Sequence, residues 1–487
     1  MKESKNKKIF LSVSVLMLII VGWFFSWVAF AEKPDKITVE SSQSATAVIA
    51  ADAPVPLSPK ANTNKSKKAV IHDAETSATT AAETSATTAA ETSATTAVEP
   101  SSTPAAEPAA APAVESSGAP AVEPSAAPAT EPSKGQAGKL VGYYAAWAAY
   151  YHFYPNQIDA GKLTHINYAF ANIGTDLKLT LGYPDVDPEN IKQLNSLKNT
   201  YPDLKTLISV GGWNWSGKFS DAALTEESRT TFADSCVDFM IKYGFDGVDL
   251  DWEYPVSGGL VGNAKRGEDK QNFTLLLKKI REKLDARGAA DHKHYLLTIA
   301  GGADKSYINN VELSKLAQYL DYANIMTYDL HGYWDANTDL LAPLYENDDP
   351  SPQYKTSVDR AVTAWLNASF PAEKLVMGIP FYGYLYSSVR DLNNGLYQPF
   401  GGSSSIGYQD IKDRYLNKSG YTGHIHPQSK VPWLFNGTIF ISYEDPQSIG
   451  HKSDYIKSKK LGGAMVWELS QDRGGELLNA LYQGLKQ

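Results

Sequence analysis

The stretch FDGVDLDWEYP, Phe245–Pro255, alternates acidic with apolar residues, and this alternation predicts a strand with two unlike faces. In an extended strand every second side chain faces the same way, so Asp249, Asp251 and Glu253 form one row. The residues between them are apolar and are expected to pack against a protein layer. The acidic row is therefore directed into an interior or a cleft.

Three carboxyl groups in one row indicate acid and base chemistry. Carboxylates about 7 Å apart repel by roughly 2.4 kcal/mol at an effective dielectric constant near 20, so the row is expected to keep at least one proton near neutral pH. A protonated carboxyl beside an ionised one can protonate a leaving oxygen and then take a proton from water. The alternative is the solvated face of an edge strand. Asp246, Gly247, Trp252 and Pro255 complete a longer pattern that argues against it.

The chain beyond Lys139 alternates short apolar runs with amphipathic segments whose apolar residues recur at helical spacing. Strand and helix alternating eight times predict the α/β class, as a (β/α)8 TIM barrel with its active site at the C-terminal ends of the strands. Glu253 falls at the end of the fourth strand. A doubly wound open sheet is the alternative, but no G-x-G-x-x-G turn follows the first run. The eight candidate strands are KLVGYYAAW, THINYAFANI, KTLISVGGW, DGVDLDWEY, YLLTIAGG, YANIMTYDL, KLVMGIPFYG and GGAMVWEL.

The barrel domain, residues 139–487, is longer than the roughly 250 residues typical of a bare barrel, so an insertion is expected. The best candidate for a small α+β insertion lies between the seventh and eighth strands, at about residues 384–442. This region is rich in Gly, Ser, Tyr and Phe and ends in the strand-like TIFISY. We expect it to form a wall beside the cleft.

Residues 1–31 are predicted to direct export. Four lysines within the first eight residues precede an uncharged stretch, so the basic end is expected to stay in the cytoplasm while the rest of the chain is exported. Two outcomes remain open. Ala29 and Ala31 form an A-x-A site suited to cleavage of a signal peptide, which would give a secreted protein. A helix of about 22 residues would instead be about 33 Å long, enough to stay as a membrane anchor.

Residues 32–138 form a low-complexity linker with almost no large apolar side chains. Its second part, residues 75–138, repeats an octapeptide that begins with Glu, as in ETSATTAA and later EPSAAPAT. Repeats that fold bury an apolar face between neighbours, and these units offer only Ala, Thr and an occasional Val. The linker is therefore expected to be disordered. It is either a tether for the C-terminal domain or a neutral tail.

The charge and cysteine content exclude some classes of function. A net charge of -9 without a basic stripe argues against a nucleic-acid partner. Cys236 is the only cysteine, which excludes an internal disulfide and a zinc site built on thiolates. Its helical surroundings predict a buried small hydrophobe.

The motifs resemble those of family 18 of the glycoside hydrolases, and within it the bacterial-type chitinases. The stretch DGVDLDWEYP fits the family signature D-x-x-D-x-D-x-E, whose first acid, Asp246, is expected to be structural. Ser209, Gly211 and Gly212 fit the S-x-G-G motif on the third strand. The tetrapeptide MTYD, Met326–Asp329, also matches, and the resemblance covers the whole barrel domain but not the linker.

The resemblance implies retaining hydrolysis of the β-1,4 linkages of chitin, assisted by the substrate. Glu253 would protonate the glycosidic oxygen, the N-acetyl carbonyl of the sugar would form an oxazolinium ion, and Glu253 would then activate water. Asp251 would accept a hydrogen bond from the acetamido N–H and share a proton with Asp249, while Tyr328 would hold the acetamido group. The ligand would be chitin or N-acetylglucosamine oligomers. No metal and no cofactor are implied, and we expect a monomer.

The resemblance also implies which side chains contact the substrate. Trp467 would form the floor beneath the reacting sugar, whereas Trp147 and Phe170 either line the cleft or pack behind it. After FYG, where many relatives have Arg, this chain has Tyr384, which puts in doubt a hydrogen bond to a bound sugar at that wall. The other positions that match substrate-lining residues are Tyr143, Trp213, Tyr254, Met326, Asp329 and Trp334.

Three other functions stay open. A chitin-binding lectin on the same barrel would have lost the acid, and the presence of Glu253 argues against it. A hydrolase of another glycan that carries N-acetylglucosamine, such as peptidoglycan or the N-glycan core, would keep the same residues. A structural or adhesive role for the exported tail is the third. The sequence does not distinguish endo from exo action or give the threading direction.

Overall fold

The computed structural model describes residues 138–486 of the chain. The expected export segment and almost all of the repeat linker lie outside the described residues. Within residues 138–486, no helix is both long enough and apolar enough to cross a membrane.

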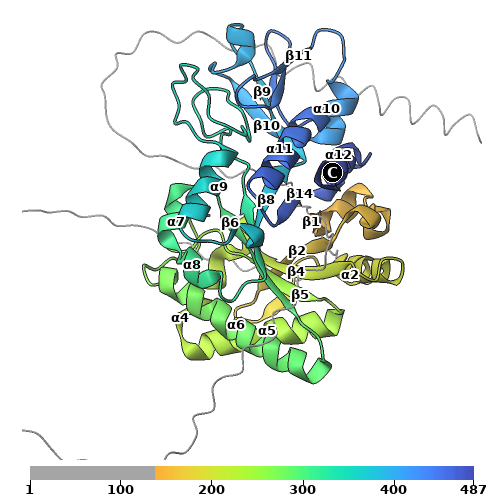
Figure 1. Cartoon of the computed structure of the whole chain (residues 1–487), viewed down its shortest axis with the longest axis vertical. Coiled ribbons are helices and arrows are strands. Elements are labelled where there is room, and N and C mark those ends of the chain that lie inside the picture. Colours follow the sequence, from red (N-terminus) through yellow and green to blue (C-terminus); the bar gives the residue numbers. More distant parts are fainter. Residues whose placement is uncertain (1–137, 487) are drawn as a thin grey trace, which may run out of the picture. The chain divides into compact units, whose positions relative to one another are not determined.

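The described part is built around a closed barrel of parallel strands, which confirms the predicted fold (Figure 1). Each of the eight candidate runs forms one strand, and the strands follow one another around the barrel in chain order. The first strand pairs with both the second and the last, which closes the sheet. A short strand β3, Leu179–Leu181, adds antiparallel to β2. The barrel strands are β1 Lys139–Ala145, β2 His165–Ile173, β4 Lys205–Gly211, β5 Gly247–Asp251, β6 Leu296–Gly302, β7 Tyr322–Met326, β8 Leu375–Pro380 and β14 Gly463–Trp467.

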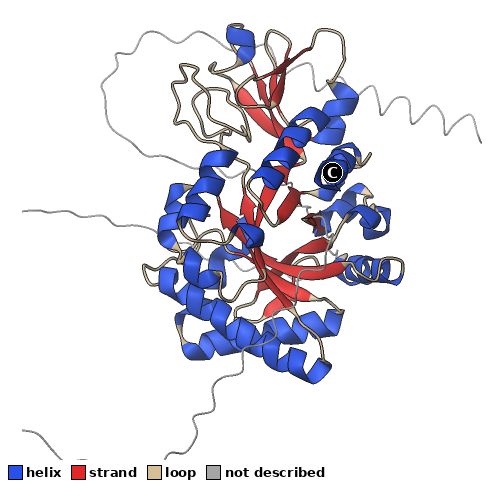
Figure 2. Cartoon of the chain, viewed as in Figure 1, coloured by secondary structure: helices blue, strands red, loops and turns tan. Residues whose placement is uncertain are grey.

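Helices cover the outer face of the barrel strands (Figure 2). The apolar row of β5 packs against this layer, since the Trp252 ring lies 5.4 Å from that of Phe219 and 5.2 Å from that of Phe273. Cys236 is fully buried in the same layer. The α-helices are α2 Asp187–Ser196, α3 Gly212–Trp215, α4 Phe219–Leu224, α5 Glu226–Tyr243, α6 Asp269–Asp291, α7 Lys305–Asn310, α8 Leu313–Leu316, α9 Val358–Asn367, α10 Tyr408–Arg414, α11 Pro446–Ser458 and α12 Glu476–Lys486.

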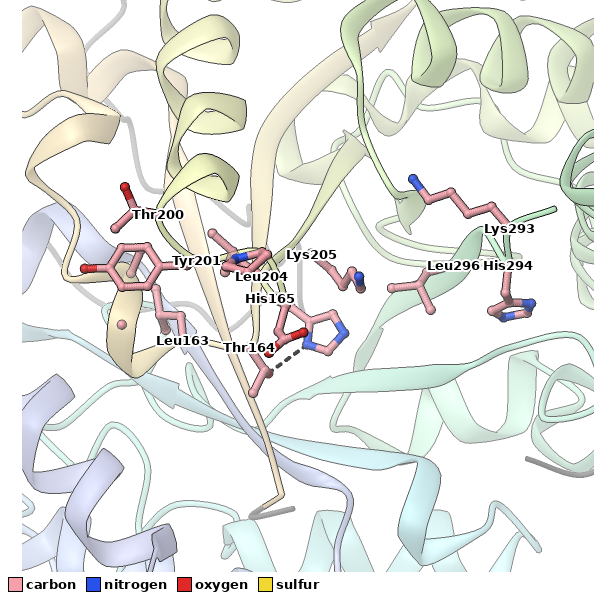
Figure 3. A pocket seen from close by; sticks show the side chains of 14 residues that line it. Leu163, Thr164, His165, Thr200, Tyr201, Leu204, Lys205, Lys293, His294 and Leu296 are labelled. Atoms are coloured by element: carbon pink, nitrogen blue, oxygen red, sulfur yellow. Dashed lines mark hydrogen bonds between the residues drawn. The ribbon is translucent and has the colours of Figure 1, made fainter. Parts of the chain in front are cut away.

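Aromatic side chains pack together at the N-terminal ends of the strands. His165 at the start of β2 packs edge-on against Tyr322 at the start of β7, with ring centres 5.2 Å apart. Desolvation by the surrounding protein lowers the pKa of His165 to about 3, so its imidazole is neutral. A hollow of about 720 Å³ opens here, and its lining includes Thr164, Lys205 and Lys293 (Figure 3). Because these residues precede or begin strands, the hollow lies at the opposite end of the barrel from Glu253.

The predicted insertion is present between β8 and β14. It is a five-stranded antiparallel sheet with the order β10-β9-β13-β12-β11, accompanied by α10. Its first strand begins at Tyr382, two residues before the expected start, and its apolar side chains form a second hydrophobic cluster together with Leu340, Leu341 and Ala342 of the segment after β7. The strands are β9 Tyr382–Ser387, β10 Gly402–Gly407, β11 Thr422–Ile425, β12 Pro432–Phe435 and β13 Phe440–Ser442.

Candidate active site

The acidic row of β5 faces the barrel interior and begins with Asp249. In the sheet Asp249 lies level with Ser209 of β4 and Thr298 of β6, and both hydroxyls donate to its carboxyl, at 2.7 and 2.5 Å. The Tyr143 hydroxyl of β1 donates a third hydrogen bond of 2.7 Å. Asp249 is fully buried, so burial raises the pKa of its carboxyl while the hydroxyl donors oppose that rise. A carboxyl with three donors can stay ionised inside the barrel.

Asp251 and Glu253 continue the row toward the C-terminal end, where they are 4% and 8% exposed. Burial raises the pKa of Asp251 well above its ordinary value, and the charges of Glu253 and Asp249 raise it further. Burial also raises the pKa of Glu253, to about 7, against a hydrogen bond from Tyr254 and with a contribution from the charge of Asp329. The pair therefore holds a proton near neutral pH. Oδ1 of Asp251 is buried and has no hydrogen-bond partner within residues 138–486.

The backbone that carries Glu253 is held by two side chains that sequence reasoning missed. The Ser216 hydroxyl accepts a hydrogen bond from the Glu253 N–H, at 2.8 Å, and lies 3.0 Å from the carbonyl oxygen of Asp251. The Asn263 amide donates to the Glu253 carbonyl oxygen, at 3.0 Å. Neither residue lies in a recognisable motif. These contacts fix the position of the acid beyond the end of β5.

The glycines of the S-x-G-G motif leave room at the end of β4. Gly211 and Gly212 both have positive φ, +100° and +72°. A Cβ on Gly211 would lie 2.5 Å from the carbonyl oxygen of Asp251, and one on Gly212 would lie 2.6 Å from the Phe170 ring. The motif therefore lets β4 end in close contact with the acidic strand.

The segment after β7 brings Met326 and Tyr328 to the same end of the barrel. Met326 is the last residue of β7 and is half-buried. The surrounding protein raises the pKa of the Tyr328 hydroxyl well above its ordinary value, and the charges of Asp251 and Glu253 add to this effect. Tyr328 is therefore a protonated hydroxyl beside the acidic row. It can donate a hydrogen bond to a ligand.

Asp329 follows directly and contacts the insertion. Its Oδ1 accepts hydrogen bonds from the hydroxyls of Tyr382, at 2.5 Å, and Tyr384, at 2.9 Å. Asp329 is exposed to solvent, and desolvation by the surrounding protein nevertheless raises the pKa of its carboxyl. The residue that departs from the family pattern, Tyr384, is thus bonded to a residue of the site, a contact that sequence reasoning did not foresee.

Trp467 stands at the end of β14 in a cluster of aromatic rings. Its ring centre lies 5.5 Å from that of Tyr143, 5.7 Å from that of Phe170 and 6.2 Å from that of Trp147. Because the Tyr143 hydroxyl bonds Asp249, this cluster adjoins the acidic row. Phe170 and Trp147 both pack against Trp467.

The remaining predicted substrate contacts lie on three different segments. Trp213 follows Gly212 directly, in α3, and its indole N–H is buried without a hydrogen-bond partner in the described part of the chain. Tyr254 follows Glu253, and its hydroxyl favours the ionised form of the Glu253 carboxyl and so opposes the rise of its pKa. Trp334, in the segment after β7, is 45% exposed. An apolar ring exposed to this degree is available to stack on a sugar.

Asp246 lies apart from these residues, at the N-terminal end of β5. Its carboxyl forms ion pairs with Lys198, at 2.9 Å, and Lys293, at 2.7 Å, and accepts a hydrogen bond from the Thr206 N–H. These contacts join the starts of neighbouring strands. Among residues 138–486, no group of three or more His, Cys, Asp or Glu side chains is arranged to hold a metal ion.

Similarity to known proteins agrees with this architecture. Chitinase A1 of Niallia circulans is 48% identical over 408 residues, which cover 70% of this chain and 58% of that protein. Chitotriosidase-1 of Mus musculus is 35% identical over 351 residues, which cover 69% of this chain and 74% of that protein. The matched region thus spans little more than half the length of Chitinase A1.

Two solved structures of glycoside hydrolases are also similar to this chain. A glycoside hydrolase family 18 N-acetylglucosaminidase from Paenibacillus barengoltzii has a TM-score of 0.66 at 40% identity, covering 71% of this chain and 99% of the other. A chitinase from Bacillus thuringiensis has a TM-score of 0.67 at 39% identity, covering 72% and 70%. The sequence profile described as glycosyl hydrolases family 18 matches residues 139–472. The chain therefore belongs to glycosyl hydrolases family 18.

Proposed function

We propose that the chain is a chitinase that hydrolyses the β-1,4 linkages between N-acetylglucosamine units of chitin and its oligomers. The observation that carries the proposal is the acidic row, in which the pKa of Glu253 is raised to about 7 and the adjoining Asp251 has a buried oxygen without a partner in the described part of the chain. Glu253 can therefore arrive protonated and give its proton to the glycosidic oxygen. A lectin needs no such acid.

The proposed reaction retains the anomeric configuration. As the glycosidic bond breaks, the N-acetyl carbonyl oxygen of the same sugar attacks the anomeric carbon to form an oxazolinium ion. Asp251 accepts a hydrogen bond from the acetamido N–H and balances the positive charge, while the Tyr328 hydroxyl holds the acetamido oxygen. Glu253, now ionised, takes a proton from the water that opens the ring.

The names of similar proteins support chitin as the substrate. Chitinase A1 and Chitotriosidase-1 are two of them. The Paenibacillus structure is that of an N-acetylglucosaminidase, which favours a second candidate, the release of single N-acetylglucosamine units from chain ends. Both activities use the same acidic row.

We also propose that the catalytic domain works outside the cytoplasm as a monomer, either secreted or held by its N-terminal segment. The lysine-rich start, the apolar stretch and the A-x-A site support export. Mass spectrometry of the mature N-terminus distinguishes the two forms, since a first residue at Glu32 would mean that the anchor has been removed.

Product analysis on soluble chitin oligomers tests the proposed function. Oligomers of four to six units should be cleaved, and the first products should carry the β-anomer. Dimers and longer products would support a chitinase, and single sugars from the outset the second candidate. Cleavage of peptidoglycan or N-glycans with intact chitin oligomers would contradict the proposal.

A further inference from the structure

Tyr384 of the insertion reaches the active site through its hydroxyl. That hydroxyl donates a hydrogen bond of 2.9 Å to Oδ1 of Asp329, the same oxygen that Tyr382 contacts at 2.5 Å. Both tyrosines lie on β9 and, two residues apart, face the same way. Two donors on one oxygen favour its charged form and fix the direction of the carboxylate.

The ring of Tyr384 has a second set of contacts. Its centre lies 6.1 Å from that of Trp334 and 5.8 Å from that of Tyr333, both edge-on. Tyr384 is only 3% exposed, whereas Trp334 is 45% exposed. Tyr384 is thus a buried side chain with two roles. Its ring packs against the exposed indole of Trp334, and its hydroxyl donates a hydrogen bond to the carboxylate of Asp329.

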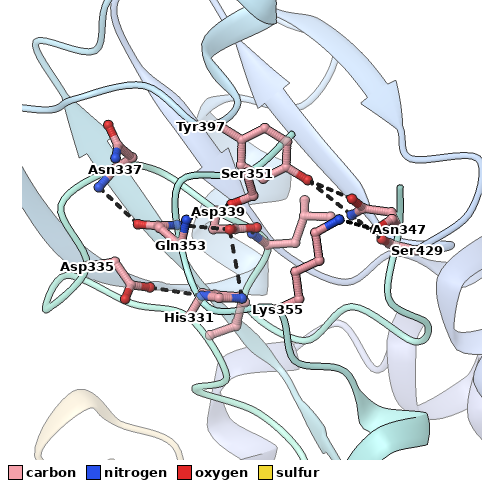
Figure 4. Close-up of polar contacts among 12 residues, drawn as sticks. His331, Asp335, Asn337, Asp339, Asn347, Ser351, Gln353, Lys355, Tyr397 and Ser429 are labelled. Carbon is pink, nitrogen blue, oxygen red and sulfur yellow. Dashed lines mark hydrogen bonds and ion pairs between the residues drawn. The ribbon is translucent and has the colours of Figure 1, made fainter. Parts of the chain in front are cut away.

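The segment from Asp329 to Trp334 is also held by contacts of His331 that do not involve Tyr384 (Figure 4). Nδ1 of His331 lies 3.0 Å from Oδ2 of Asp335, and Nε2 lies 3.8 Å from Oδ2 of Asp339. The side chain of Gln353 in turn donates to Asp339, at 2.9 Å. Loss of one hydroxyl on β9 should therefore change the carboxyl of Asp329 without moving the segment.

We propose that Tyr384 is a positioning residue for the reaction: its hydroxyl holds the Asp329 carboxylate beside the catalytic acid, and its ring supports Trp334. The inference rests on the proposed function, because it concerns the acid that this function assigns to Glu253. Tyr384 acts through Asp329 and has no assigned contact with the substrate.

Through Asp329, Tyr384 is expected to influence the pKa of Glu253. The negative charge of Asp329 raises the pKa of Glu253, so whatever keeps Asp329 ionised keeps Glu253 protonated to higher pH. Asp329 forms no ion pair within residues 138–486, so the hydroxyl donors supply its stabilisation. The titratable groups that face Asp329 are Tyr382, Tyr384 and Tyr386 of β9, Tyr328 of its own segment and Glu253 beyond β5.

The test is the pH profile of kcat/KM for Tyr384→Phe, which removes the hydroxyl and keeps the ring. Without one donor Asp329 binds a proton more readily, its charge falls, and the pKa of Glu253 falls with it. The alkaline limb should move to lower pH by roughly 0.3 to 1 unit, so activity above the limb should drop about twofold to tenfold. Activity below the limb should change little, and the tryptophan fluorescence should stay that of the wild type.

Two further variants show whether the effect passes through Asp329. Tyr386→Phe removes a hydroxyl from the same strand, and it should leave the limb in place, because the Asp329 carboxyl accepts hydrogen bonds from Tyr382 and Tyr384 and not from Tyr386. In the background of Asp329→Asn, Tyr384→Phe should cause no further shift. An equal shift in that background, or coincident limbs for Tyr384→Phe and the wild type, would overturn the inference while the proposed function stands. A wild type that cleaves no oligomer at any pH would overturn both.

Discussion

The Tyr143 hydroxyl donates a hydrogen bond of 2.7 Å to Oδ2 of Asp249, joining the first and fourth strands of the barrel across its interior. With Ser209 and Thr298 it completes three hydroxyl donors on a fully buried carboxyl. Asp251 is also buried, but its Oδ1 has no partner in the described residues. Donors stabilise the ionised form only where they are present, so the free enzyme should keep Asp249 ionised and leave the proton with the pair Asp251 and Glu253.

Replacing Tyr143 by Phe tests this distribution of charge. The ring would still pack against Trp467, but Asp249 would lose one of its donors and compete for the proton that Glu253 must give to the glycosidic oxygen. A hydrogen bond to a charged group is worth about 1.5–3 kcal/mol, so kcat should fall about tenfold to a hundredfold on chitin oligomers. Tyr322→Phe is the matched control, because its buried hydroxyl has no partner within residues 138–486. A wild-type kcat for Tyr143→Phe would show that Asp249 needs no third donor.

Replacing Glu253 by Gln should abolish hydrolysis of chitin oligomers and leave their binding intact. The amide keeps the shape of the side chain but has no proton to give. Turnover by reducing-end assay and binding by calorimetry measure the two effects separately. If the variant keeps more than about a hundredth of the normal turnover, the acid has been assigned to the wrong residue.

The activity should be lost on the alkaline side as pH rises through about 7. Glu253 acts in its protonated form, burial raises its pKa to about 7, and the group is therefore ionised and inactive above that value. The measurement is kcat/KM on a soluble oligomer from pH 5 to pH 9. A profile that stays flat to pH 9 would mean that the free enzyme does not depend on this proton.

Chains that lack N-acetyl groups at the reacting sugar should be inert. The proposed nucleophile is the acetamido oxygen of the substrate, and no other carboxyl of the row is assigned to attack the anomeric carbon. Fully deacetylated chitosan and chitin oligomers of matched length provide the comparison. Rapid cleavage of the deacetylated chains would require a nucleophile from the protein.

The alternation of side chains along one strand was enough to predict much of the active site. Asp249, Asp251 and Glu253 share a face because of their spacing alone, and the eight apolar runs predicted the barrel that receives them. The hydroxyl of Thr298 could not be found in this way, since its contact depends on how β5 and β6 align. Strand register is set by closure of the barrel, and no short sequence pattern indicates it.

The same limit applies to contacts between loops. Ser216 and Asn263 hold the Glu253 backbone from segments 37 and 10 residues away in the chain, and neither belongs to a motif. Tyr384 departs from the family pattern, but its hydrogen bond to Asp329 joins residues 55 positions apart. Contacts of this kind depend on how loops and the insertion pack against the barrel, and no short sequence pattern records that packing.

Removing one partner of a buried ion pair should strongly destabilise the domain. Lys452 of α11 and Glu444 are both almost fully buried and bonded to each other, and Lys452 also donates to the carbonyl oxygen of Ala342, at 2.9 Å. Lys452→Met would leave the Glu444 charge uncompensated, so the free energy of unfolding should fall by about 3–5 kcal/mol, as measured by urea denaturation. Lys459→Met, which breaks a half-exposed pair at the end of the same helix, should cost under about 1 kcal/mol. If the double variant Glu444→Gln with Lys452→Met were less stable than Lys452→Met alone, the loss would not come from the unpaired charge.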